Sequence, residues 1–113
     1  MNFTKTTGHS PLFVRSNGVL HALRPDDIRF VHSSGNYCEI HTTKRQFLVK
    51  KSLASLIEVL QPYGLRQVHR SYLVGLHHID RVHATENRIE LGEQRIPLGR
   101  KYREPLLENL RVI

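Results

Sequence analysis

Turn-forming residues interrupt this chain so often that most of its elements must be short. Asn17-Gly18 supplies the positive-φ turn typical of hairpins, and Gly35-Asn36, Glu86-Asn87 and Gly92-Glu93 separate later apolar runs. Short strands at such close spacing predict a mainly β domain of several short antiparallel strands with one or two short α-helices. The expected strands are residues 12–15, 19–23, 28–34, 37–43, 46–49, 66–69, 79–83, 88–91 and 94–98.

Two segments have helical spacing. In residues 52–60, Ser52 is a good N-cap, and apolar residues recur at i, i+3, i+4 and i+7 to form one stripe. Residues 61–64 then stop the helix, because they contain proline and glycine. A second helix is expected over about residues 100–110, where Pro105 should kink the helix or delay its start.

The length of 113 residues predicts one domain, over residues 11–113, preceded by a flexible N-terminal arm over residues 1–10. No apolar run approaches the roughly 18 residues that cross a membrane. Residues 1–10 are polar, so we expect no secretion signal there. The single Cys38 cannot form an internal disulfide, which fits a reducing cytoplasm.

The charge balance favours a polyanionic partner. Lys and Arg number 17 against 10 Asp and Glu, giving +7, and arginine predominates among the cations. The planar fork of arginine suits phosphates and guanine edges. No polybasic cluster or long basic helix points to a membrane surface. The alternative is that the excess charge only keeps a small domain soluble.

The sequence gives little support for a catalytic site or a metal-binding site. The eight histidines include no pair at the i, i+4 spacing of a helical metal site, and Cys38 has no partner cysteine. His77 and His78 are adjacent, so on a strand they would point to opposite faces. Asp26-Asp27 follow a proline in a turn (residues 24–27), where aspartate usually caps backbone amides. No phosphate loop or serine elbow is present, so we expect no enzyme, cofactor, metal or small-molecule substrate.

Three basic segments could contact a phosphodiester. Lys50-Lys51-Ser52 opens the first helix, where cations and free N–H groups converge. His69-Arg70-Ser71-Tyr72 sets four hydrogen-bonding side chains at a strand exit. The loop from which Arg70 projects would be anchored by its apolar neighbours Val68, Leu73, Val74 and Leu76. Gly99-Arg100-Lys101-Tyr102-Arg103 again joins cations to a helix start. The alternatives are a solvated helix start, a surface arginine paired with a glutamate, and a basic helix face.

Four segments together resemble the LytTR family of bacterial DNA-binding domains. They occur in the family's order and at its separations, and the resemblance extends from about Leu12 to Leu110. The segments are Asp27-Ile28 leading to Gly35-Asn36-Tyr37, then Lys50-Lys51-Ser52-Leu53, Val68-His69-Arg70-Ser71-Tyr72-Leu73-Val74, and Ile96-Pro97-Leu98-Gly99-Arg100-Lys101-Tyr102-Arg103.

The resemblance implies an elongated β fold whose loops enter successive major grooves and bend the duplex. It implies that Arg70 and Arg100 read bases and that the loop at Asn36, Tyr37 and Cys38 supplies a third contact. Phosphate contacts are implied for Lys50, Lys51, His69, Ser71 and Lys101. Family members are usually output domains of two-component response regulators, and two protomers are expected on direct repeats of double-stranded DNA.

Three residues depart from the family pattern. Gly75 replaces the usual asparagine, which removes a polar side chain expected beside the Arg70 loop. Gly99 stands where serine is common, so the last helix loses a side-chain cap, although glycine is an acceptable one. Pro105 falls where the family normally continues a regular helix.

Three functions therefore compete. The leading hypothesis is a sequence-specific, duplex-binding transcriptional regulator. The second is a small basic β domain that binds RNA or single strands, but such proteins stack bases on aromatics and this chain has four Tyr, four Phe and no Trp. The third is a protein-interaction or sensory module that needs no nucleic acid.

Overall fold

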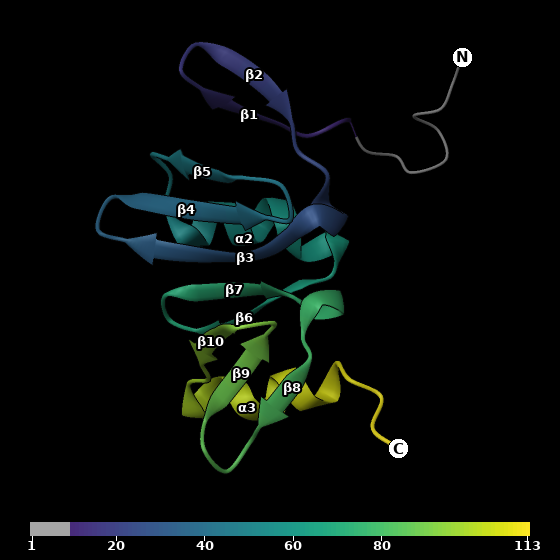
Figure 1. The fold of residues 1–113 in the computed structure, drawn as a ribbon. Helices are drawn as coiled ribbons and strands as arrows, with labels where there is room; N and C mark the ends of the chain where they lie inside the picture. The colour runs from purple at the N-terminus through teal and green to yellow at the C-terminus, as the bar shows by residue number, and fades with distance from the viewer. Residues whose placement is uncertain (1–9) are drawn as a thin grey trace.

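A five-stranded antiparallel sheet forms the centre of the computed structural model, which describes residues 10–113 (Figure 1). The strand order is β5-β4-β3-β7-β6. Neighbours in the sequence pair through short turns, and β3 joins the two halves by pairing with both β4 and β7. The strands are β3 (Ile28–Ser34), β4 (Tyr37–Thr42), β5 (Gln46–Val49), β6 (Leu65–His69) and β7 (Tyr72–Gly75).

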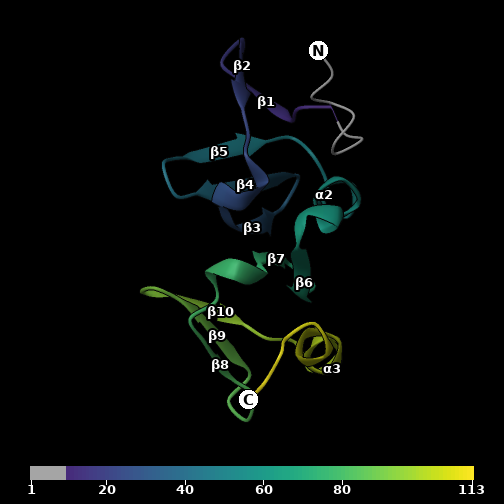
Figure 2. The same ribbon diagram turned by 90° about the vertical axis from the view of Figure 1, so that its right-hand side faces the viewer.

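Two smaller sheets lie at the ends of the central one (Figures 1 and 2). A hairpin of β1 (Phe13–Ser16) and β2 (Val19–Ala22) lies beyond β5. Asn17 and Gly18 have φ values of 52° and 77°, the left-handed pair that the hairpin prediction requires. Beyond β6, a three-stranded sheet contains β8 (Arg81–His83), β9 (Arg88–Leu91) and β10 (Gln94–Pro97).

Two α-helices pack against these sheets. Helix α2 (Leu53–Leu60) begins after Ser52, whose hydroxyl accepts a hydrogen bond from the Ser55 N–H at 3.1 Å, as its sequence predicts. Helix α3 (Arg100–Glu108) begins at Arg100, so Pro105 does not delay its start. Three 3₁₀ turns complete the fold: η1 (Pro25–Asp27), η2 (Gln61–Tyr63) and η3 (Leu76–His78).

The central sheet separates two hydrophobic cores. Along β7, Leu73 enters the core beneath α2, whereas Val74 enters the core that the C-terminal sheet and α3 cover. Strand β6 divides in the same way, with Leu65 and Val68 on opposite sides. Because side chains alternate along a strand, a sheet covered on both faces joins the two cores into one unit.

Strand β7 is the main element that the sequence prediction missed. Leu73, Val74 and Leu76 were expected to anchor a loop, but Tyr72–Gly75 form a strand between β3 and β6. The run lacks polar and apolar alternation because Leu73, Val74 and Gly75 are all buried. The loop at Arg70 is therefore a two-residue turn between β6 and β7, held on a rigid sheet.

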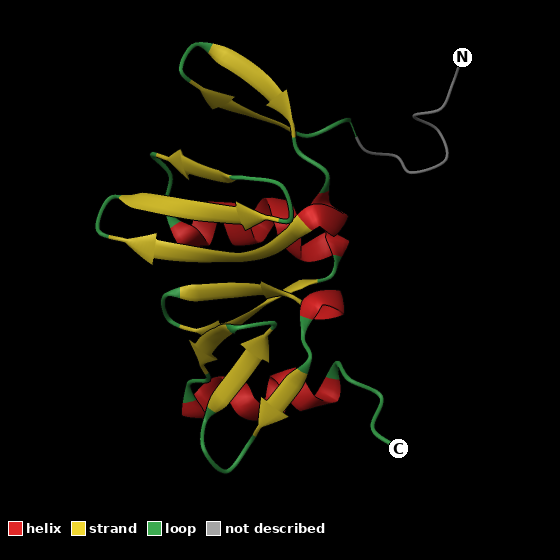
Figure 3. Cartoon of the chain, viewed as in Figure 1, coloured by secondary structure: helices red, strands yellow, loops and turns green. Residues whose placement is uncertain are grey.

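The molecule is elongated and mainly β, and this prediction is confirmed. Its principal extents are 46 × 33 × 23 Å. Strands account for most of the regular structure, as Figure 3 shows by colour. The expected arm over residues 1–10 lies outside the described residues except for Ser10. No helix in residues 10–113 is long and apolar enough to span a bilayer.

Candidate nucleic-acid interface

Strand register brings four segments that are distant in the sequence to one edge of the molecule. Ser34 pairs with Tyr37 across the β3–β4 turn, and Cys38 pairs with Val49, the last residue of β5. The segment after β5 therefore begins beside that turn. The Ser33 N–H donates to the Ser71 carbonyl at 2.9 Å, which sets the β6–β7 turn next to it. Figure 1 shows these turns on the left-hand side.

The start of α3 joins the same edge. The Gly99 N–H donates to the Val68 carbonyl at 2.7 Å, beside the end of β6. We call residues 36–37, 50–51, 69–71 and 99–101 the turn edge. It contains nine of the ten residues that the sequence predicts as DNA contacts, although those residues are spread over more than half of the chain.

Arg70 occupies the tip of the β6–β7 turn. It is exposed, and no hydrogen bond or ion pair within residues 10–113 engages its guanidinium. His69 holds the turn: its Nδ1 accepts a hydrogen bond from the Ser71 N–H at 3.1 Å, and its ring meets Tyr72 edge-on at 5.7 Å. With Nδ1 occupied, Nε2 is the ring nitrogen that remains for a ligand.

Arg100 and Lys101 occupy the first two positions of α3. Both are exposed, and the Lys101 Nζ lies 5.4 Å from the centre of the Tyr102 ring. Gly99 is the N-cap and contributes no side-chain hydrogen bond. A Cβ at Gly99 would lie 2.9 Å from the Tyr102 ring, so glycine lets this ring pack against the helix start.

The β3–β4 turn presents Asn36 and Tyr37 to solvent, whereas the side chain of Cys38 is fully buried. The expectation that Cys38 contacts DNA is therefore wrong. Side chains alternate along β4, so exposure of Tyr37 turns Cys38 into the core. Burial raises the pKa of the Cys38 thiol, and a hydrogen bond with Ser33 opposes this only partly.

Lys50 and Lys51 complete the turn edge. Both are exposed, and neither forms an ion pair within residues 10–113. They directly precede the Ser52 cap, so their charges add to the positive end of the α2 dipole. Two arginines elsewhere do form ion pairs: Arg81 and Arg88 both contact Glu90, at 3.3 and 3.4 Å.

A family model of the LytTr DNA-binding domain matches residues 18–111. The chain belongs to the LytTR family. Among solved structures, it is similar to the "LytTr DNA-binding domain of putative methyl-accepting/DNA response regulator from Bacillus cereus", with a TM-score of 0.75. That match covers 90% of this chain and 97% of the other at 15% identity, so it shows a shared fold. The comparison with curated proteins found no match.

Gly75, where the resemblance to the family led us to expect asparagine, has a structural explanation. It ends β7 on the edge away from the Arg70 turn, so the expected effect on that loop is wrong. A Cβ at Gly75 would lie 2.5 Å from the Ile28 carbonyl oxygen of β3. This approach is too close for any side chain unless the backbone moves. The departure therefore concerns strand packing rather than DNA contact.

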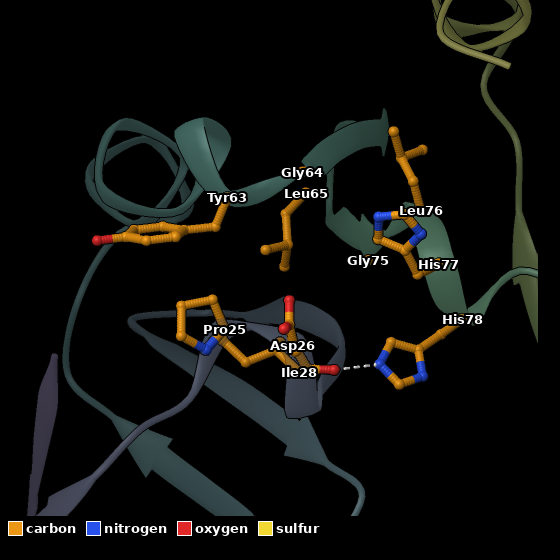
Figure 4. Close-up of a pocket in the computed structure, with 10 residues that line it drawn as sticks. All are labelled: Pro25, Asp26, Ile28, Tyr63, Gly64, Leu65, Gly75, Leu76, His77 and His78. Atoms are coloured by element: carbon orange, nitrogen blue, oxygen red, sulfur yellow. Dashed lines mark hydrogen bonds between the residues drawn. The ribbon is translucent and has the colours of Figure 1, made fainter. Parts of the chain in front are cut away.

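The edge away from the turns contains a small cavity of about 310 Å³ (Figure 4). His77 and His78 both line it because they belong to η3 rather than to a strand, so the expectation of opposite faces does not apply. The His78 Nε2–H donates to the Asp26 carbonyl at 2.7 Å and joins η3 to η1. Figure 4 shows this hydrogen bond below Tyr63 and His77.

Proposed function

We propose that the turn edge binds double-stranded DNA in a sequence-specific manner and that the chain acts as a transcriptional regulator rather than as an enzyme. The observation that carries this proposal is the gathering of Lys50, Lys51, Arg70 and Arg100 on one edge, where they are exposed and form no ion pair with any other described residue. Cations left unpaired by the protein are available to neutralise phosphates and release counterions.

The dimensions of the molecule support contact with successive major grooves. Its longest extent is 46 Å, and the turns follow one another along the long direction in Figure 1. One helical turn of B-DNA measures about 34–36 Å. The molecule is therefore longer than one helical turn of the duplex, which supports an arrangement in which different turns of the edge enter adjacent major grooves on one side of the DNA.

Two kinds of contact follow from the side chains. Arg70 and Arg100 read bases, because an exposed arginine at a turn tip or helix start can bond a guanine edge with both arms. Asn36 and Tyr37 add a contact from the β3–β4 turn. Lys50, Lys51, His69, Ser71 and Lys101 hold phosphates, which fix position without reading sequence.

The chain's role follows from its family. The Bacillus cereus relative is described as part of a response regulator, and we propose that this chain is likewise the DNA-binding output of a bacterial two-component-type system in the cytoplasm. We further propose that two protomers bind adjacent direct repeats. Each protomer would then present its turn edge to the same side of the duplex.

Selection from a random duplex library tests the proposal. We expect one enriched motif, repeated in the same orientation, and an affinity that falls steeply with salt. The selected duplex should bind more tightly than either of its single strands, which separates this function from RNA or single-strand binding. A library without enrichment at low salt would contradict DNA binding and favour a protein-interaction module.

A further inference from the structure

An apolar groove lies between the β1–β2 hairpin, β5 and α2, with a volume of about 460 Å³. The described residues that line the groove include ten with apolar side chains. Three of them are unusually exposed for their type: Phe13, Leu48 and Val59 are 55%, 57% and 47% exposed. Clustered apolar exposure of this kind marks a binding site in a soluble domain.

Three cations lie at the end of this groove nearest the turn edge. Arg15 is the last exposed residue of β1 before the hairpin turn, and Lys50 and Lys51 follow β5. All three are exposed and form no ion pair within residues 10–113. The described lining includes no carboxylate, so the groove is apolar along its length and positively charged at one end.

We propose that this groove binds an amphipathic anion, a single-chain carboxylate whose hydrocarbon tail lies in the groove and whose head group contacts Arg15, Lys50 and Lys51. Charge and polarity both favour this occupant. An inorganic anion would leave the apolar walls exposed, and a neutral lipid would leave the cations unpaired. The volume lies within the roughly 300–1,000 Å³ typical of small-molecule sites.

The proposed ligand has a regulatory consequence that rests on the proposed function. Lys50 and Lys51 belong to both the turn edge and the groove. A carboxylate bound there would neutralise cations that otherwise hold phosphates, and its head group would occupy space that the duplex needs. Ligand and DNA should therefore compete, and the ligand should weaken cognate and random duplexes by the same factor.

Titration of the isotope-labelled full chain without DNA tests the site directly. Octanoate, decanoate and dodecanoate are compared below their micelle concentrations by amide chemical shifts. We expect shifts in β1, β5 and α2, with affinity increasing by up to about fourfold for each methylene until the groove is full. Decanol, which has the tail without the charge, should bind about two- to fivefold more weakly than decanoate.

Two variants separate the head-group and tail contacts. Arg15→Gln should weaken the affinity for decanoate by about two- to fivefold, and Val59→Asn should weaken it by about threefold. Both residues are exposed, so the variants should fold. Lys44→Gln, a cation of the distant β4–β5 turn, should change nothing. The proposal would be overturned if butyrate bound as tightly as decanoate. It would also be overturned if Lys44→Gln and Arg15→Gln weakened decanoate binding equally. The proposal would also be overturned if decanoate did not bind and the chain formed a dimer that Val59→Asn dissociates.

Competition with the selected duplex then tests the regulatory consequence. Decanoate should release DNA from the native chain and act at higher concentration on Arg15→Gln. If decanoate binds but DNA does not, the proposed ligand site is supported and the proposed function is wrong. If both bind without competition, the regulatory consequence is wrong.

Discussion

The two edges of the central sheet differ in how they use their polar groups. At the turn edge, Arg70 and Arg100 are exposed and form no ion pair within residues 10–113. At the other edge, which consists of η1, η3 and the β4–β5 turn and which we call the closed edge, backbone hydrogen bonds join elements. There, the Thr43 N–H donates to the Asp27 carbonyl and the Leu76 N–H to the Gly64 carbonyl, at 2.9 and 3.1 Å. The turn edge therefore keeps the side chains of Arg70 and Arg100 available for a partner, whereas these hydrogen bonds at the closed edge stabilise the fold.

This comparison predicts that substitutions at the two edges separate binding from stability. The largest effect is expected for Arg70→Ala combined with Arg100→Ala. Each change should cost about 1–3 kcal/mol of affinity on the selected site and relax the base preference there. Thermal unfolding should change little, because both side chains are exposed. Fluorescence anisotropy with cognate and random duplexes measures the difference.

The matched control is Arg81→Ala combined with Arg88→Ala, because it removes the same charge from arginines that contact Glu90. If this control lost as much affinity as the Arg70 and Arg100 variant, net charge rather than the turn edge would account for binding.

The opposite outcome is expected for Gly75→Asn, which introduces the residue that the family resemblance led us to expect. Its Cβ would meet the Ile28 carbonyl oxygen, so we expect a loss of about 1–3 kcal/mol in the free energy of unfolding. The base preference of the folded fraction should stay unchanged. Denaturant unfolding and anisotropy measure the two effects. His77→Asn, an exposed neighbour, serves as the control, and equal stability of both variants would refute the packing explanation.

A smaller effect is expected for Lys51→Gln. Loss of one phosphate contact should weaken the affinity for all duplexes by the same factor. It should also reduce the magnitude of the slope of log affinity against log salt concentration by about one. Lys44→Gln, on the closed edge, should leave the slope unchanged. A change in base preference with Lys51→Gln would mean that this residue reads sequence.

The smallest effect concerns acid stability in the body of the sheet, between the edges. A hydrogen bond with His41 and the charge of His32 hold the pKa of Glu39 below its ordinary value, although burial opposes them. A lowered pKa contributes stability above about pH 4.5 that is lost as the pH falls through the folded-state value. Glu39→Gln should therefore flatten the loss of stability below that pH. An unchanged acid profile would show that the contact contributes nothing.

Local patterns in the sequence predicted most of the fold. The Asn17-Gly18 turn, the Ser52 cap and the apolar stripe of α2 each act within a few residues, so they could be recognised without the structure. Strand β7 could not be recognised by alternation, because it is covered on both faces. The burial of Cys38 was recognisable, since it alternates with exposed Tyr37 and shares a face with Ile40.

The candidate site was only partly predictable. The resemblance to the LytTR family located the basic segments, but only strand register showed that they share one edge. The groove beside Arg15 had no signal in the sequence. It combines a hairpin, an edge strand and a helix whose exposed apolar residues look unremarkable one at a time.

Chemical-shift mapping of the labelled chain with the selected duplex tests the central claim most directly. The account predicts that the largest amide shifts fall at the turn edge, in residues 36–37, 50–51, 69–71 and 99–101. The amides of η1, η3 and the β4–β5 turn, on the closed edge, should stay nearly unchanged. The account would be contradicted if the turn-edge amides did not shift and the large shifts fell on the closed edge or along β8 and β9.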